Sequence, residues 1–95
     1  MEKVMVTTQN ETVYLFSKDQ DGKWHFLRHL REYLSIEPIR VRPGKSMKII
    51  AQKFNGMTYT IEEDELLISS SPVKEISVDG KKLTGFEAWR GITIG

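Results

Sequence analysis

Four turn-forming dipeptides constrain the fold of this chain more than any other feature: Asp21-Gly22, Pro43-Gly44, Asn55-Gly56 and Asp79-Gly80. Glycine and asparagine tolerate the positive φ angles of tight turns, and proline presets a turn φ, so each dipeptide favours a chain reversal or a break between segments. Most of the intervening segments are short and rich in β-branched and aromatic residues, which is typical of strands. Because tight turns join neighbouring strands, we expect mostly antiparallel pairing.

Residue alternation places the first strands. Residues 4–8 and 12–17 predict a hairpin. Residues 37–41 and 47–54 predict a second hairpin around Pro43-Gly44, in which Val41 faces Met47. Both faces of residues 47–54 carry apolar residues, as a rolled sheet requires.

Asn55-Gly56 is the strongest local signal, because both central residues of a type I′ turn need positive φ. A two-residue turn there places Lys48 opposite Glu63, where the two charges can pair. Further on, residues 70–72 break the chain, residues 73–78 form a strand, and Asp79-Gly80 turns it into another tight hairpin. Residues 83–94 predict a short irregular or single-turn segment before a final strand at 92–94.

One segment reads as a helix. Apolar residues recur at helical spacing through three turns after Gly22, at Phe26, Leu27, Leu30, Tyr33 and Leu34. The alternative makes Asp21-Gly22 a hairpin turn and residues 23–27 a strand. We expect the helix, and therefore an α+β fold: a mostly antiparallel, strongly curved sheet or small barrel-like roll with one packed helix over about residues 23–35.

Length and composition narrow the class of protein. Ninety-five residues suit one small domain spanning residues 1–95. The absence of cysteine excludes disulfide scaffolds and thiolate-bound zinc, and favours an intracellular, cytoplasmic location. The amino end resembles no signal peptide, and the longest apolar run has four residues, so we expect no membrane partner.

The charges are segregated along the chain. Residues 23–53 carry eight of the fourteen Lys and Arg residues but only two of the thirteen acids. Such a segment can form an anion-binding or partner-binding face, or it can pair with the acidic residues 62–65. The candidate site residues are the cations that share a face or an adjoining loop in this reading: Arg28, Arg31, Arg40, Arg42, Lys45 and Lys48.

A metal site is a further candidate. On a helix, His25, His29 and Glu32 would lie at i, i+4 and i+7 on one face, where two imidazoles and a carboxylate can bind a borderline metal. The competing interpretation is a solvated face in which Glu32 pairs with Arg28. No phosphate-binding loop, nucleophile elbow or aspartate-rich motif accompanies these residues, so we expect no enzyme and no cofactor.

The leading hypothesis is a non-enzymatic interaction module that presents a surface to a macromolecule, most simply a protein. The first alternative is a nucleic-acid-binding domain that uses residues 23–53, and the second is a metal-binding or metal-dependent protein around His25 and His29. Self-association is a related possibility, through an unpaired edge strand or an exposed patch of Phe86 and Trp89.

Overall fold

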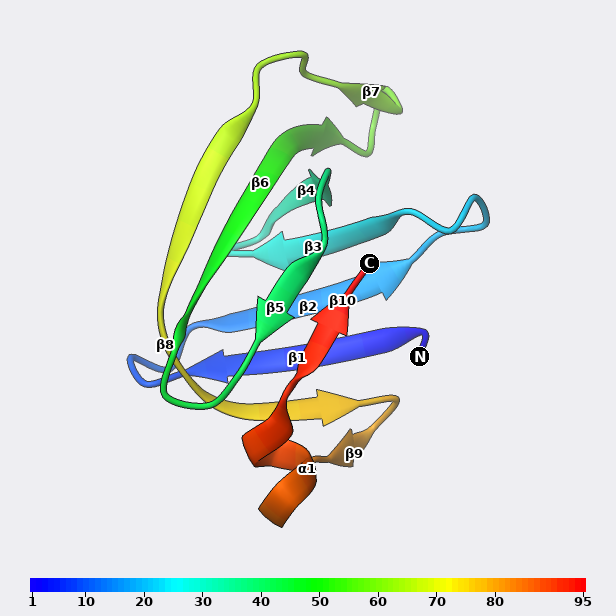
Figure 1. Cartoon of the computed structure of the whole chain (residues 1–95). Coiled ribbons are helices and arrows are strands. Elements are labelled where there is room, and N and C mark those ends of the chain that lie inside the picture. Colours follow the sequence, from blue (N-terminus) through cyan, green and yellow to red (C-terminus); the bar gives the residue numbers. More distant parts are fainter.

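The computed structural model describes all residues from Met1 to Gly95, which form ten strands and one short helix (Figure 1). The strands are β1 (Lys3–Thr8), β2 (Val13–Lys18), β3 (Trp24–Arg28), β4 (Arg31–Ser35), β5 (Ile39–Val41), β6 (Ser46–Asn55), β7 (Thr60–Ile61), β8 (Leu66–Val78), β9 (Lys81–Lys82) and β10 (Ile92–Ile94). The helix, α1 (Gly85–Arg90), lies between β9 and β10. This one six-residue helix falls far short of the length needed to cross a bilayer.

Six strands close into an antiparallel barrel. Their order is β1, β2, β3, β4, β6 and β8, and β8 pairs with β1 to complete the circle. Closure depends on β8, whose first half pairs with β6 and whose second half pairs with β1. Figure 1 shows this long strand curving around one side of the molecule. The barrel thus removes most of the unpaired strand edges that an open sheet would expose.

The bend in β8 lies at residues 70–72, where the sequence predicted a break. Instead of ending the strand, the bend shifts the register against β6 between Ser46 and Lys48. The Ser70 hydroxyl accepts the Met47 N–H at 2.8 Å and donates to the Ser71 carbonyl at 2.7 Å. Pro72, which has no N–H, is tolerated beside this irregularity.

The predicted helix over residues 23–35 is wrong, and so is the α+β class that depended on it. The segment forms the β3–β4 hairpin, in which Arg28 faces Arg31 across a two-residue turn. The turn residues His29 and Leu30 have φ angles of 50° and 62°. Both central residues of a type I′ turn adopt positive φ, but neither histidine nor leucine is a usual choice there. This turn therefore has no recognisable sequence signal. The fold is a small β-barrel.

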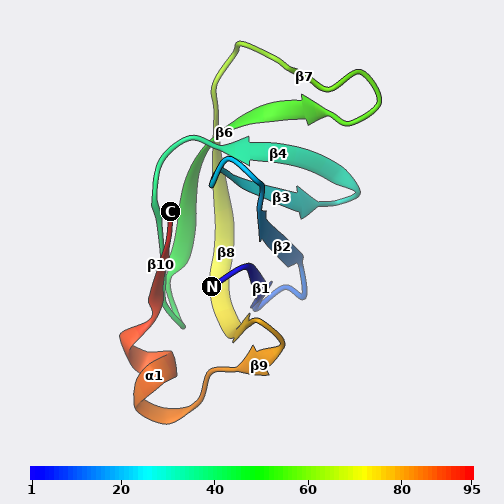
Figure 2. The same cartoon turned by 90° about the vertical axis from the view of Figure 1, so that its right-hand side faces the viewer.

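A two-stranded ribbon of β5 and β10 packs against the barrel (Figure 2). The predicted hairpin of residues 37–41 with 47–54 is therefore wrong, because Val41 pairs with Ile92 and not with Met47. Pro43 instead forms an isolated parallel bridge with Val73. The predicted final strand and the short helical segment before it are confirmed as β10 and α1.

The tight turns have mixed outcomes. The hairpin of β1 and β2 is confirmed, as is the two-residue turn at Asp79-Gly80, where Val78 faces Lys81. The two-residue turn at Asn55-Gly56 is wrong, since Asn55 pairs with Thr60 across a four-residue loop. The Asn55 side-chain oxygen accepts the N–H of Met57 at 3.0 Å, as in an Asx-turn, and this longer loop changes the register.

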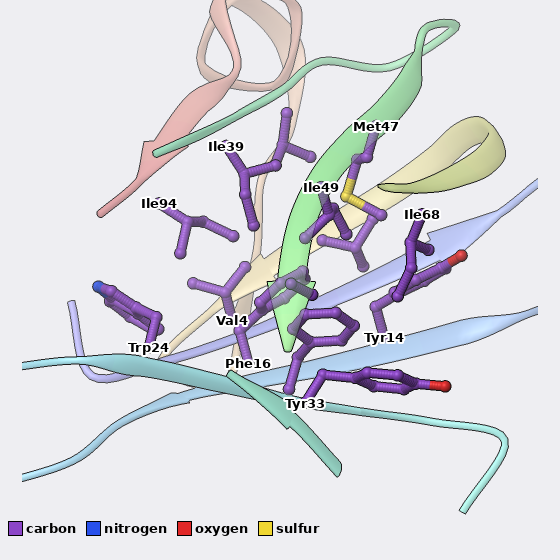
Figure 3. Packing of buried hydrophobic residues seen from close by; sticks show 14 of the residues in the cluster. Val4, Tyr14, Phe16, Trp24, Tyr33, Ile39, Met47, Ile49, Ile68 and Ile94 are labelled. Atoms are coloured by element: carbon purple, nitrogen blue, oxygen red, sulfur yellow. The ribbon is translucent and has the colours of Figure 1, made fainter. Parts of the chain in front are cut away.

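Inward-facing side chains fill the barrel (Figure 3). Register places Phe16, Phe26 and Tyr33 side by side on β2, β3 and β4, and neighbouring ring centroids are 5.2 and 5.1 Å apart. Ile39 and Ile94 of the ribbon point into the same cluster. Replacing one buried phenylalanine by alanine in such a core costs about 3–5 kcal/mol.

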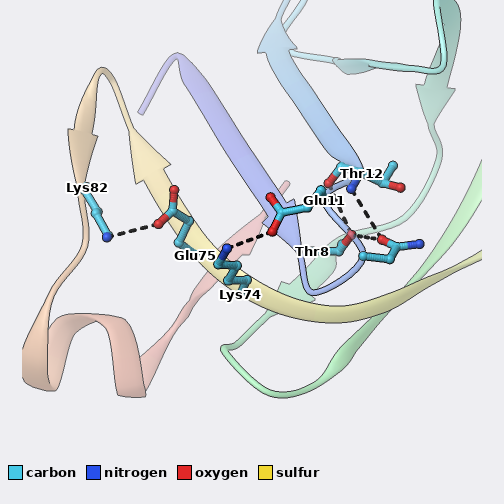
Figure 4. A network of polar contacts seen from close by, with 7 residues as sticks. Thr8, Glu11, Thr12, Lys74, Glu75 and Lys82 are labelled. Carbon is cyan, nitrogen blue, oxygen red and sulfur yellow. Dashed lines mark hydrogen bonds and ion pairs between the residues drawn. The ribbon is translucent and has the colours of Figure 1, made fainter.

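Ion pairs support the outside of β8 (Figure 4). Lys74 contacts Glu11 of the β1–β2 turn at 2.8 Å, and Lys82 of β9 contacts Glu75 at 3.0 Å. The Glu11 carboxylate raises the pKa of Lys74 above its ordinary value. These pairs are exposed, so each contributes little to stability.

Candidate protein interface

Two large aromatic side chains stand on the exposed face of α1. Phe86 and Trp89 are three residues apart, which places them on one face of the helix, and their rings stack at 5.9 Å with an interplanar angle of 28°. They are 70% and 65% exposed, and no residue of α1 is buried. Their apolar surface is therefore available to another molecule.

The connections on either side hold this short helix in place. Six residues are too few for a helix that is stable alone. Before α1, Leu83 packs against the core and its N–H donates to the Ile76 carbonyl. After α1, the N–H of Gly91 donates to the Ala88 carbonyl at 3.0 Å, and the chain enters β10 directly. The aromatic pair is thus presented from an anchored position.

Pairing of β5 with β10 brings two arginines to α1. The Arg42 guanidinium lies 5.6 Å from the centroid of the Trp89 ring, in a cation–π arrangement. Arg40 faces Thr93 across the ribbon and donates a hydrogen bond to the carbonyl of Arg90. We call Phe86, Trp89, Arg40 and Arg42 the aromatic platform.

The other four predicted cations lie elsewhere. Arg28 and Arg31 flank the β3–β4 turn, which projects from the side of the barrel away from the β5–β10 ribbon (Figure 2). Arg28 lies 5.9 Å from the ring centroids of both Tyr14 and Tyr33, and its Nε is buried without a hydrogen-bond partner. The remaining two are exposed, Lys45 in the loop before β6 and Lys48 on β6.

The acidic residues do not neutralise the basic segment. No lysine or arginine between residues 23 and 53 forms an ion pair with a carboxylate. The predicted pairing of Lys48 with Glu63 is wrong, because β6 and β8 place Lys48 opposite Ser69. The cations of the aromatic platform therefore have no carboxylate partner within the chain.

His25 lies between two carboxylates. Its Nε2 is 2.8 Å from Asp19 Oδ2, and its Nδ1 is 3.3 Å from Glu32 Oε2 but is not aligned for a hydrogen bond. The Lys23 N–H, followed by the His25 side chain, holds the pKa of Asp19 below its ordinary value. Both ring nitrogens therefore face carboxylates.

The helical spacing behind the proposed metal site does not exist. His25 belongs to β3, whereas His29 is an exposed turn residue. No group of three or more His, Cys, Asp or Glu side chains is arranged to hold a metal ion.

Some surface residues were not predicted as site residues. Arg90 supplies the carbonyl that Arg40 contacts. Met5, Leu15 and Leu27 are apolar but face outward, and 38–46% of each is exposed. One signal was available: residues 13–16 form an uninterrupted apolar run, and a strand with such a run has apolar side chains on both faces.

No protein-family model matches this chain, and no curated protein or solved structure matches it either.

Proposed function

We propose that this protein is a non-enzymatic interaction module and that its aromatic platform binds a protein partner. The observation that carries the proposal is the stacked, mostly exposed pair of Phe86 and Trp89 with Arg42 against the tryptophan. Tryptophan and arginine are enriched among the residues that contribute most to protein interfaces. Stacking also fixes the rings before binding, which reduces the entropy lost on association.

Charge around the platform defines the partner surface. Arg42 lies against the Trp89 ring, Arg40 contacts the Arg90 carbonyl, and Arg90 is in the last turn of α1, whose one acidic residue is Glu87. The partner surface therefore combines an apolar side chain, which covers the rings, with carboxylates, which pair with the arginines. A cytoplasmic location is part of the same proposal, supported by the cysteine-free sequence.

The experiment compares wild-type protein with Trp89→Ala and with a matched control, Leu67→Ala. Leu67 is also 65% exposed but lies on β8. Partners are captured with tagged wild-type protein and identified by mass spectrometry, and each purified partner is titrated calorimetrically. We expect Trp89→Ala to weaken binding by about 30-fold, the equivalent of about 2 kcal/mol, and Leu67→Ala to leave it unchanged.

Equal affinities for wild type and Trp89→Ala would refute the platform as the binding surface. A second titration uses labelled single-stranded DNA and RNA, because stacked aromatics beside arginines also suit bases. Binding that weakens steeply with salt and is lost in Trp89→Ala would replace the protein partner by a nucleic acid.

A further inference from the structure

A row of apolar side chains crosses the outer wall of the barrel. Met5 of β1 faces Leu15 of β2, and Leu15 faces Leu27 of β3. The three side chains are 38%, 46% and 43% exposed, while their neighbours along each strand point into the core. In an antiparallel barrel with a solvated outer surface, such positions are polar. This row is therefore an exposed apolar patch, of the kind that another molecule covers.

The wall is hollowed at this row. A groove of about 470 Å³ follows it, and its polar lining includes Lys3, Ser17, His25 and Glu32. None of the groove residues belongs to the aromatic platform, whose residues lie on α1, on β5 and directly after β5. The groove is thus a separate surface of the molecule.

A second row beside the first has a lysine at one end and, at the other, a histidine that contacts two carboxylates. Lys3 faces Ser17, and Ser17 faces His25. Lys3 has no ion-pair partner in the chain, whereas His25 lies between the carboxylates of Asp19 and Glu32. The groove therefore has an unpaired cation on its β1 side and two carboxylates on its β3 side.

These two rows are self-complementary. Consider two walls packed face to face, with a two-fold axis running along β2 in the plane between them. This operation places β1 of one copy over β3 of the other and keeps each row in register. Met5 then covers the partner's Leu27, and Leu15 meets the partner's Leu15. Lys3 lies over the partner's His25, next to the Glu32 carboxylate that contacts this histidine. Every apolar side chain of the row is covered, and the unpaired cation comes next to a carboxylate.

We propose that the groove binds a second copy of this chain, and that the protein forms a two-fold symmetric dimer through the outer faces of β1, β2 and β3. The charge arrangement favours this occupant, because a two-fold interface requires one patch to complement itself. The dimer leaves the aromatic platform of each copy free for a different partner.

Sedimentation equilibrium tests the dimer with the intact chain, from about 1 to about 300 µM. We expect wild type to approach twice its chain mass of 11.0 kDa. Leu15→Glu places two carboxylates on the axis and weakens the dimer at least about tenfold. The matched control, Leu67→Glu on β8, does not change the dissociation constant. A single-chain mass for wild type at every concentration overturns the proposal, as does a Leu15→Glu variant that dimerises like wild type.

A charge exchange tests the pairing without disturbing the apolar row. Lys3→Glu and Glu32→Lys each weaken the dimer about tenfold, since each creates two like-charge contacts by symmetry. The double variant Lys3→Glu with Glu32→Lys restores the dissociation constant to within about threefold of wild type. Failure of the double variant to recover overturns the proposed arrangement.

One further result separates this proposal from the proposed function. Trp89→Ala leaves the dimer unchanged if the two surfaces are independent. A Trp89→Ala variant that is monomeric, together with a dimeric Leu15→Glu variant, would move the second copy to the aromatic platform and overturn the proposal.

Discussion

Gly91 joins α1 to β10 and approaches a neighbouring backbone more closely than any other glycine of the chain, so the variant Gly91→Ala tests how the aromatic platform is built. Gly91 is buried, with φ 72° and ψ −169°, a region that essentially only glycine occupies. A Cβ atom added there would lie 2.2 Å from the Val41 carbonyl oxygen and 2.6 Å from Arg42 Cγ. The first of these atoms is backbone, so it cannot move without shifting β5.

The cost has two parts. The backbone conformation alone costs a residue with a side chain about 1–3 kcal/mol. Relief of the contact with Val41 requires β5 and β10 to separate, which weakens the pairing of Val41 with Ile92 and withdraws Arg42 from Trp89. We expect a total loss of at least about 3 kcal/mol, which for a chain of this length lowers Tm by about 12–24 °C.

The assay is thermal and urea unfolding followed by circular dichroism, with Gly44→Ala as the matched control. Gly44 has a similar φ of 81°, but an added Cβ would meet no heavy atom within 4 Å. We expect Gly44→Ala to cost only about 1–2 kcal/mol, since it carries backbone strain without a clash. Equal losses of unfolding free energy in the two variants would refute the close approach of Gly91 to β5. Tryptophan fluorescence provides a second readout, because the environment of Trp89 should change in Gly91→Ala alone.

Three further predictions concern stability. Leu30 is fully exposed and has a φ of 62°. Leu30→Gly should therefore relieve backbone strain and raise the unfolding free energy by about 0.5–1 kcal/mol. A lower unfolding free energy in urea titration would contradict this. The Ser70 hydroxyl satisfies the buried N–H of Met47, so Ser70→Ala should cost about 1–3 kcal/mol, and an unchanged urea midpoint would refute that role. Hydrogen bonds from the Lys3 N–H and then the Glu2 N–H hold the pKa of Asp79 below its ordinary value of 3.8. The ionised carboxylate of Asp79 therefore stabilises the fold above about pH 4, and this stabilisation is lost as pH falls through the lowered pKa. Asp79→Asn should reduce the fall in unfolding free energy at acidic pH. An unchanged fall would contradict this role of Asp79.

The hairpins that depend on local turn chemistry could be predicted, whereas the pairing that closes the fold could not. Asp79-Gly80 has the residues of a type I′ turn and forms one, with φ angles of 50° and 84°. The pairing of β5 with β10 joins residues about fifty positions apart, and no local pattern encodes it. The same limit applies to the candidate site. Arg40 and Arg42 were singled out by charge, but only this distant pairing brings Arg42 to the Trp89 ring and Arg40 to the Arg90 carbonyl.

The failed helix prediction has a physical cause that bears on function. Trp24 and Phe26 face the core, while Leu27 faces outward, and the exposed Leu30 follows in the turn. Apolar residues on both faces of one hairpin reproduce the spacing of a helical stripe, since residue 30 is one helical turn from both residue 26 and residue 27. In a hairpin buried only on its inner face, apolar and polar residues alternate along each strand, and this pattern predicts strands. The outward-facing Leu27, which contributed to the wrong helix prediction, also belongs to the apolar row of Met5, Leu15 and Leu27 through which we propose the dimer. The apolar character of that row therefore serves the assembled protein. We expect replacement of Leu27 by a polar residue to give a single-chain mass in sedimentation equilibrium.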